Sequence, residues 1–271
     1  MPLLLGCDPE FFLKEKGKSK FISAFDMIPG TKDEPYTVPH GAVQVDGMAL
    51  EFNTDPTDKA DEFVYNIHEV LKTLRGMVPI DFDFAFEATA HFEQKYFDEQ
   101  PYPAKLLGCD SDFDAYTSLQ NEQPDGKQAM RTAAGHLHLG WQDNKEIDPS
   151  HFKKASAIVR QLDFFLGIPS LVLDPDMERR QMYGKAGSFR PKPYGVEYRV
   201  LSNFWLKNGV LMTWVFNATN EAYNRLVAGQ EALFDEYAEK AQQIINNNDV
   251  ASAQDFMDSN NKFYTSLEGL T

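Results

Sequence analysis

The sequence is poor in cysteine and in basic residues. Its two cysteines, Cys7 and Cys109, are too few for a disulfide framework and suit a reducing compartment. Lys and Arg number 26 against 41 Asp and Glu, which leaves a net charge of -15. Duplex nucleic acid binds through Lys and Arg that neutralise its phosphates, so we expect no nucleic-acid partner. Any anionic ligand must meet a local cluster of cations or a metal ion.

Long apolar runs are also scarce. The apolar start of the chain, from Met1 to Cys7, has no basic region and is too short for an export signal. We find no later stretch that is predicted to be long and apolar enough to span a membrane. These absences predict a soluble, cytoplasmic protein with no membrane partner.

The composition that remains is that of a well-packed globular protein. The chain has 271 residues, of which 42% are hydrophobic and 13% aromatic, enough to bury a large core. We expect one large domain over residues 1–229, followed by a C-terminal helical extension over residues 230–271 that packs on it.

The stretch from Arg131 to Gly140 has the pattern of a strand with one chemical face. Because side chains alternate along a strand, His136 and His138 point to one face while Leu137 and Leu139 point to the other. One face is predicted to join the core, and the other is free for chemistry.

Three further stretches share this design, with polar or ionisable residues two apart in an apolar or aromatic run. They carry Asp8 and Glu10, Glu51 and Asn53, and Glu197 and Arg199. We interpret the four stretches as strands of one sheet whose polar face lines a pocket. Carboxylates crowded on a half-buried surface stay ionised only if cations offset their charge, and a metal ion is the simplest such cation.

Other signals predict the remaining elements. Pro9 confines the first strand to a sheet edge or a bulge, because proline cannot donate to a ladder. Helix-start signals stand at 55–58 and at Asp148-Pro149, and Ser202 or Asn203 is expected to cap a third helix. Strands are predicted at 3–14, 43–53, 80–87 and 194–201, loops at 21–37 and 91–128, and helices at about 59–74, 149–166, 203–227, 230–247 and 251–267.

The segment from Met177 to Arg190 is dense in cations and glycine. Such a loop can bring backbone N–H groups and positive charge to a phosphate, which is notable in an acidic protein. A solvated basic loop explains the same composition, and the spacing alone does not separate the two interpretations.

Taken in order, these motifs resemble the glutamine synthetase superfamily, which includes the glutamate-cysteine ligases. The family strand Gly-x-Glu-Pro-Glu-Phe-Phe is similar to Gly6-Cys7-Asp8-Pro9-Glu10-Phe11-Phe12, and the next metal-binding glutamate to Glu51 after Gly47. The family His-x-His strand is similar to Gly135-His136-Leu137-His138, and Arg-x-Glu-x-Arg to Glu197-Tyr198-Arg199. Phage and bacterial carboxylate-amine ligases within this superfamily are the most similar group.

The chain departs from the family pattern at two positions. Asp8 replaces the first glutamate and shortens its reach by one methylene. Gly195 stands where the family has an arginine two residues before the glutamate, and Arg190 is the candidate to replace that arginine.

The resemblance implies an α+β fold, with a mainly antiparallel curved sheet, covering helices and a C-terminal helical segment. It implies an ATP-dependent ligase that joins a carboxylate to an amine through an acyl phosphate, with two or three Mg2+ or Mn2+ ions. The substrates would be small-molecule or peptide acids and amines, the location the host cytoplasm if the chain is phage-encoded, and the oligomeric state stays open.

Roles for individual residues follow from the same resemblance. The expected metal ligands are Asp8, Glu10, Glu51, His136 and Glu197. Arg199, Arg190 and Glu197 are expected to be catalytic, with Lys185, Arg190, Arg199 and His136 facing the nucleotide. Substrate binding is expected from His138, Arg179, Arg180 and Asn53.

Two other functions stay open at this point. One is a metal-dependent hydrolase that holds zinc on His136 and His138, a common zinc arrangement. The other is a binding or structural module that keeps the fold without catalysis.

Overall fold

The computed structural model describes residues 2–106, 112–122, 128–143, 145–174, 176–230, 232–264 and 269–270. Cys7 is buried, whereas Cys109 lies outside the described residues. All statements below concern the described part of the chain.

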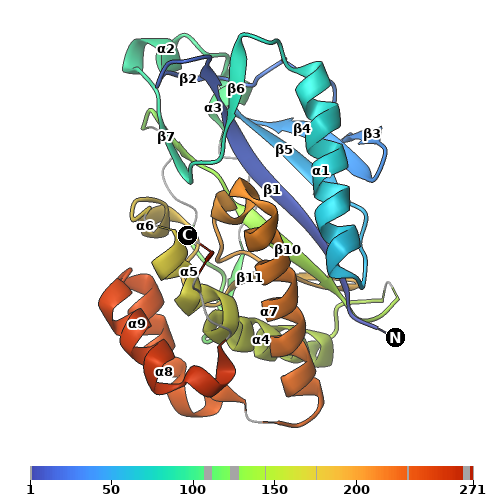
Figure 1. The fold of residues 1–271 in the computed structure, drawn as a ribbon, viewed down its shortest axis with the longest axis vertical. Coiled ribbons are helices and arrows are strands. Elements are labelled where there is room, and N and C mark those ends of the chain that lie inside the picture. Colours follow the sequence, from blue (N-terminus) through green and yellow to red (C-terminus); the bar gives the residue numbers. More distant parts are fainter. Residues whose placement is uncertain are drawn as a thin grey trace.

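An open antiparallel sheet forms the centre of the molecule (Figure 1). Its strands follow the order β3-β4-β5-β1-β10-β12-β11-β8, with β2 and β6 also paired to β1, while β7 and β9 form a separate pair. The predicted α+β fold with a mainly antiparallel sheet is confirmed. The strand bounds are β1 Leu4–Glu15, β2 Phe21–Ile22, β3 Tyr36–Val38, β4 Gly41–Asp46, β5 Ala49–Thr54, β6 Phe82–Ala85, β7 Thr89–His91, β8 Phe113–Asp114, β9 Met130–Thr132, β10 Gly135–Gly140, β11 Ser188–Lys192 and β12 Gly195–Tyr198.

Strand β1 lies between β5 and β10, so of the two predicted alternatives for Pro9, a sheet edge or a bulge, the edge is wrong. Pro9 lies opposite Gly135 at the end of the ladder with β10, and the ladder with β5 begins at the next residue, Glu10. The proline is tolerated because it falls where β1 changes from one partner strand to the other.

Helices lie on both faces of the sheet, and the long helices pack on its apolar face. Their bounds are α1 Ala60–Met77, α2 Gln94–Asp98, α3 Tyr102–Lys105, α4 Pro149–Leu162, α5 Ile168–Leu173, α6 Arg179–Met182, α7 Gly209–Val227, α8 Leu233–Asn246 and α9 Val250–Ser259. A π-helical turn, Asp163–Gly167, joins α4 to α5, and short 3-10 helices cover Asn203–Lys207 and Asn261–Phe263. Figure 1 shows α8 and α9 beside α4 and α5, away from α1.

Several helix ends differ from the prediction. The helix from Pro149 continues through the π-helical turn to Leu173 rather than ending near Gly167. Ser202 caps only the 3-10 helix, and Asn208 caps α7 by accepting a hydrogen bond from the Leu211 N–H. The predicted cap at Asp148 is confirmed, because its carboxylate accepts from the His151 N–H at 2.8 Å.

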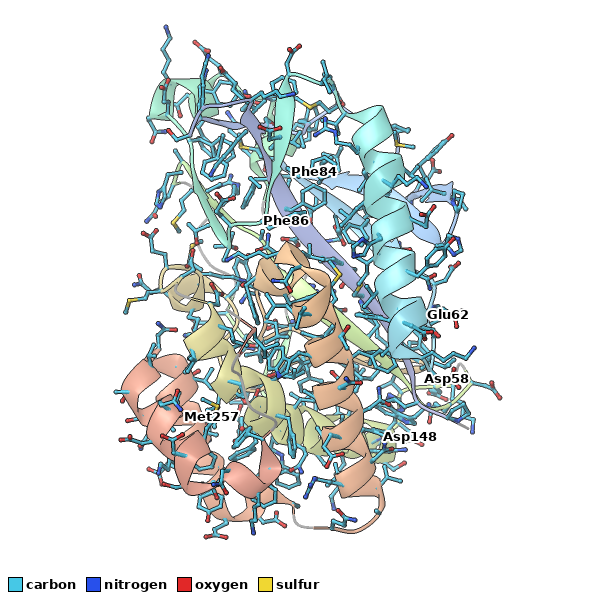
Figure 2. All side chains as sticks on the ribbon, viewed as in Figure 1. Asp58, Glu62, Phe84, Phe86, Asp148 and Met257 are labelled. Carbon is cyan, nitrogen blue, oxygen red and sulfur yellow. The ribbon has the colours of Figure 1, made fainter. Side chains whose placement is uncertain are left out.

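The main core lies between the sheet and helices α1, α4 and α7. Leu137 and Leu139 are fully buried in it, which confirms the predicted apolar face of β10. Phe11 packs in the same core, and its ring centroid lies 4.8 Å from that of Phe84 and 5.3 Å from that of Phe86. Figure 2 shows Phe84 and Phe86 beside β1.

One helical stretch passes a length and composition test for a membrane span, so the prediction that none would do so is wrong. The stretch is Pro149–Leu173, and 78% of its apolar window is buried inside the protein. Burial of this kind is typical of a core helix in a soluble protein, and here the helix packs under β11 and β12.

The opposite face of the sheet is apolar only at one end. There Phe12 packs with Met48, Phe92 and Phe97 in a second, smaller core. Asp8 and Glu10 precede Phe12 on the same face of β1, because side chains alternate along the strand. The small core therefore closes one end of a polar surface.

Candidate functional site

The strand register brings the polar residues of four strands together. Asp8 on β1 lies opposite His136 on β10, and His138 lies opposite Glu197 on β12. On the other side of β1, Glu10 lies opposite Glu51 on β5. The predicted convergence of these stretches on one face of one sheet is therefore what the structure shows.

Asp8, His136 and Glu197 form the first cluster, with one ligand atom from each lying within 4.8 Å of the others. His136 Nδ1 is 3.5 Å from both Asp8 Oδ1 and Glu197 Oε1. Burial and the nearby Arg199 lower the pKa of His136 to about 4. At neutral pH its imidazole is therefore uncharged, the form that binds metal ions.

A close backbone approach fixes the start of β10 beside this cluster. A Cβ on Gly135 would lie only 2.2 Å from Ser202 O, so no other residue fits there without a shift. The Gly135 N–H donates to Leu201 O at 3.0 Å. This contact ties His136 to the segment that follows β12.

Positive charges surround the first cluster. Lys192 Nζ and Arg190 Nη1 lie 2.8 and 3.4 Å from Glu197 Oε2, and Arg199 donates to Glu197 Oε1. Burial raises the pKa of Glu197, but the charges of Arg199, His136 and His138 together outweigh it, so the net pKa lies well below the usual range. The cluster is therefore ionised and largely neutralised by the protein itself.

Asp8 is held in the same way by the two histidines. Its Oδ1 lies 2.9 Å from His138 Nε2, and the Tyr194 hydroxyl hydrogen-bonds the other ring nitrogen of His138. Burial raises the pKa of Asp8, but the charge of His138 and hydrogen bonds from both histidines bring it well below its usual value.

Glu10, Asp46 and Glu51 form the second cluster, again with ligand atoms within 4.8 Å of one another. Burial and the charge of Asp46 raise the pKa of Glu10 to about 7. Burial and Asp8 raise the pKa of Glu51 well above its usual value. Among the described residues, no Lys, Arg or His makes an ion pair with these three carboxylates.

The donors of both clusters fit divalent metal ions. Carboxylate oxygens with one neutral imidazole suit hard cations such as Mg2+ and Mn2+. The second cluster also has the electrostatic character of a cation site, because its carboxylates repel one another and ionise readily only when a cation joins them.

A cleft that is partly open to solvent is lined by Glu10 and Asp46 of the second cluster and by His136 of the first, whereas Asp8, Glu51 and Glu197 lie outside its lining. Its acidic lining includes Glu10, Asp46 and Asp112, and its basic lining includes Arg131, Arg179 and Arg199. Acidic and basic groups in one cleft can hold metal ions and anions side by side.

Arg199 is held rigidly at the cleft. Its Nε donates to Asp112 Oδ2 at 3.0 Å while its Nη1 donates to Glu197. Asp112 in turn accepts from Asn121 Nδ2 at 2.8 Å. A guanidinium fixed by two carboxylates keeps its orientation, so a ligand that meets it costs little further rotational freedom.

The structure places the other predicted site residues less uniformly. Arg179 lines the cleft and donates to Val200 O and Arg199 O at 2.9 and 3.3 Å. Arg180 does not line it, because its three nitrogens donate to Asn248, Gly184 and Ser170. Lys185 is exposed next to the cleft residue Gly184, and Asn53 is half-buried on β5 outside the cleft lining.

Several residues of the site were not predicted from the sequence, among them Asp46, Asp112, Arg131 and Lys192. Asp46 and Lys192 each had a signal, because they lie two residues after Gln44 and Arg190 on strands whose side chains alternate. No sequence signal pointed to Asp112, because its role depends on a hydrogen bond with Arg199, which lies 87 residues away in the sequence.

The fold and the site define a class of protein in which an open antiparallel sheet carries carboxylate clusters beside a cleft lined by arginines. Residues 127–259 match the family described as "Phage phiEco32-like COOH.NH2 ligase-type 2". This match confirms the resemblance to carboxylate-amine ligases and supports an enzyme of that kind. It spans just under half of the chain and contains β10, β11 and β12, whereas β1, β4 and β5 lie outside it.

Two solved structures are similar at low level. A bifunctional glutathione synthetase from Pasteurella multocida is 10% identical with a TM-score of 0.39, and the match covers 96% of this chain and 49% of that one. A novel glutamine synthase homolog is 12% identical with a TM-score of 0.36, and the match covers 100% of this chain and 68% of that one. The chain thus spans about half the length of the first enzyme, and at these scores neither likeness carries an argument. A comparison with curated proteins finds no match.

Proposed function

We propose that the protein is an ATP- and Mg2+-dependent carboxylate-amine ligase that forms an amide or peptide bond through an acyl phosphate. The observation that carries the proposal is that two clusters of metal-ligand type lie on one sheet face, beside a cleft that Glu10, Asp46 and His136 line together with three arginines. The family match over residues 127–259 supports the ligase class. The requirement for ATP and metal is inferred from the site.

The chemistry proceeds in two displacements. A substrate carboxylate oxygen attacks the γ-phosphorus of ATP, and the bond to ADP breaks. The uncharged amine then attacks the acyl carbon, the bond to phosphate breaks, and the amine loses a proton. Phosphoryl transfer of this kind depends on positioning and on neutralising charge rather than on covalent catalysis.

Each cluster would hold one metal ion, the first through Asp8, His136 and Glu197 and the second through Glu10, Asp46 and Glu51. Bound Mg2+ or Mn2+ supplies charge neutralisation at the phosphate oxygens. A third ion has no separate group of three ligands among the described residues.

The arginines would orient the phosphates and the substrate. Arg199, fixed by Asp112 and Glu197, would stabilise the negative charge on the transferring group, with Arg190 beside Glu197. Arg179 would bind a substrate oxyanion from within the cleft, and the exposed Lys185 would bind phosphate at its rim.

Other predicted roles receive less support. His138 is engaged by Asp8 and Tyr194, so it would orient Asp8 rather than contact substrate. Arg180 is committed to structural hydrogen bonds, and Asn53 lies outside the cleft lining. We keep residues 1–229 as the proposed catalytic domain and 230–271 as a proposed extension, whose helices α8 and α9 pack on α5.

Thermal unfolding with Mg2+ and ATP, together with phosphate release across pairs of acids and amines, tests the proposal. Mg2+ plus ATP is expected to raise the melting temperature by ligand linkage, and one acid and amine pair is expected to release phosphate. Asp46→Asn and Glu51→Gln should each weaken the response to Mg2+, because only the first cluster stays intact, whereas the exposed Asp81→Asn, just before β6, should not change it.

Other outcomes separate the alternatives. Stabilisation by zinc without any response to ATP would favour a hydrolase, although His138 belongs to neither three-ligand group among the described residues. Saturable ATP binding without turnover for any pair would favour a binding module. Either result would contradict the ligase proposal.

A further inference from the structure

Two of the three cleft arginines have no carboxylate partner. Arg199 is paired with Glu197 and Asp112, but no described carboxylate lies within ion-pair distance of Arg131 or Arg179. Both side chains are nearly inaccessible, with 6% and 2% of their surface exposed. The carboxylates of Glu10 and Asp174 offset the charge of Arg179 only from beyond ion-pair distance, and a buried cation without a close counter-charge is destabilising unless a ligand supplies one.

The hydrogen bonds of these two residues go almost entirely to backbone carbonyls. Arg131 donates from Nη1 to Gln128 O and Met130 O and from Nη2 to Lys105 O, at 2.6 to 2.9 Å. Its guanidinium carbon also lies 4.6 Å from the centre of the Phe97 ring. Carbonyl dipoles hold the group in place but leave its net positive charge uncompensated.

Each guanidinium also has a donor left over. The Nε–H groups of Arg131 and Arg179 are buried and have no hydrogen-bond partner. Burial lowers the pKa of Arg179 to about 10 and lowers that of Arg131, yet both stay protonated at neutral pH. The two residues come from β9 and α6, segments distant in the sequence that meet in this cleft.

We propose that Arg131 and Arg179 form an oxyanion subsite in the cleft, which binds a carboxylate or phosphate group of a ligand. The assignment of this group to a substrate rests on the proposed ligase function. If the bound group is a carboxylate, the acid or the amine substrate carries a carboxylate in addition to the one that reacts. Two guanidinium groups match such an anion because their planar N–H forks fit two oxygens.

A matched arginine outside the cleft provides the control. Arg75 on α1 donates to Phe82 O, Val78 O and Pro79 O and stacks on Phe84 at 4.7 Å. This pattern repeats that of Arg131, with three carbonyls and one phenyl ring, but Arg75 does not line the cleft. Arg75→Met therefore removes the same kinds of contact as Arg131→Met, at a half-buried position, without the predicted loss of binding.

Isothermal titration of the full chain at constant ionic strength, without metal, tests the subsite with glutarate, inorganic phosphate and AMP as probes. We expect at least one probe to bind with 1:1 stoichiometry. Arg131→Met and Arg179→Met should each weaken it by about tenfold or more, the effect of losing a hydrogen bond to a charged group, while Arg75→Met leaves it unchanged. Arg131→Lys, which keeps the charge but not the fork, should bind with intermediate affinity.

The probes distinguish the source of the oxyanion. Binding of glutarate that AMP does not displace assigns the subsite to a substrate carboxylate, whereas binding of AMP and phosphate without glutarate assigns it to the nucleotide. If Arg131→Met unfolds by circular dichroism, the Arg131→Lys and Arg179→Lys proteins carry the comparison. Absence of binding by all three probes, or equal affinity in wild type and the arginine variants, would overturn the inference.

The subsite and the proposed ligase can fail separately. Arginine-dependent binding of glutarate in a protein that never turns over ATP would leave the subsite standing and remove the ligase. If the protein turns over and the KM values for ATP, acid and amine are the same in wild type, Arg131→Lys and Arg179→Lys, the ligase proposal stands and the subsite is removed.

Discussion

The two carboxylate clusters lie side by side on one sheet face, yet their charge is balanced in opposite ways. Around Asp8 and Glu197, the protein supplies arginine, lysine and histidine, and the pKa of each carboxyl lies well below its usual value. Around Glu10 and Glu51 it supplies no ion-pair partner among the described residues, and burial raises the pKa of both. One cluster is neutralised by the fold, and the other depends on protons or on a bound cation.

This difference separates two ways of making an acidic site. The first cluster is ionised before any ligand arrives and contributes to stability through its ion pairs. The second is destabilised when its carboxylates ionise, so metal binding there must displace protons. The fold therefore gives the second cluster the stronger dependence on pH and on metal concentration.

The largest expected effect comes from removing the charge at the centre of the first cluster. Glu197→Gln leaves Lys192 without its carboxylate and Arg199 with Asp112 alone, and should lower the free energy of unfolding by about 3–5 kcal/mol. Urea unfolding at pH 7 measures it, with Glu62→Gln, on the exposed first turn of α1 (Figure 2), as the control. A loss no larger than that of the control would show that the cluster is not held by these ion pairs.

The next largest effect is a pH dependence of the free energy of unfolding, which comes from the second cluster because burial raises the pKa of Glu10. The pKa of Glu10 rises from 4.5 to about 7 on folding, so its contribution to stability is complete below pH 4.5 and is lost as the pH rises through about 7. Without metal, this loss should amount to on the order of 3 kcal/mol by pH 8.

The measurement is the free energy of unfolding from pH 4.5 to 8 in EDTA, taken as the difference between wild type and Glu10→Gln. This difference isolates Glu10 from the histidines, which titrate in the same range. Mg2+ should remove most of the pH dependence, because a bound cation stabilises the ionised form. A difference that does not change with pH would contradict the predicted protonation of Glu10.

The smallest effect concerns a cation at the rim of the first cluster. Lys192 lies 2.8 Å from Glu197, but a quarter of its side chain is exposed and solvent screens the pair. Lys192→Met should therefore cost only about 0.5–1 kcal/mol of stability, since Arg199 continues to balance Glu197. Chemical denaturation of Lys192→Met and Glu197→Gln measures the loss of unfolding free energy in each variant. An equal loss in the two variants would contradict the prediction that Lys192 contributes less than Glu197.

Much of the site could be predicted because strand alternation is local. The two-residue spacing of Asp8 and Glu10, and of His136 and His138, places each pair on one face regardless of the fold. The helix signals at Asp148 and along α1 were equally local. Predictions failed where a distant partner decides the outcome, as at Pro9, whose neighbours change from β10 to β5.

The sequence by itself determined which residues share a strand face and where the apolar stripes lie, because these follow from backbone geometry over a few residues. Only the tertiary structure decided that Glu10 meets Asp46 and Glu51 without a cation, that Glu197 meets Lys192 and Arg199, and that Arg180 is used for packing. The physical reason is that ion pairing and desolvation depend on distances across strand registers and helix contacts, which no local pattern records.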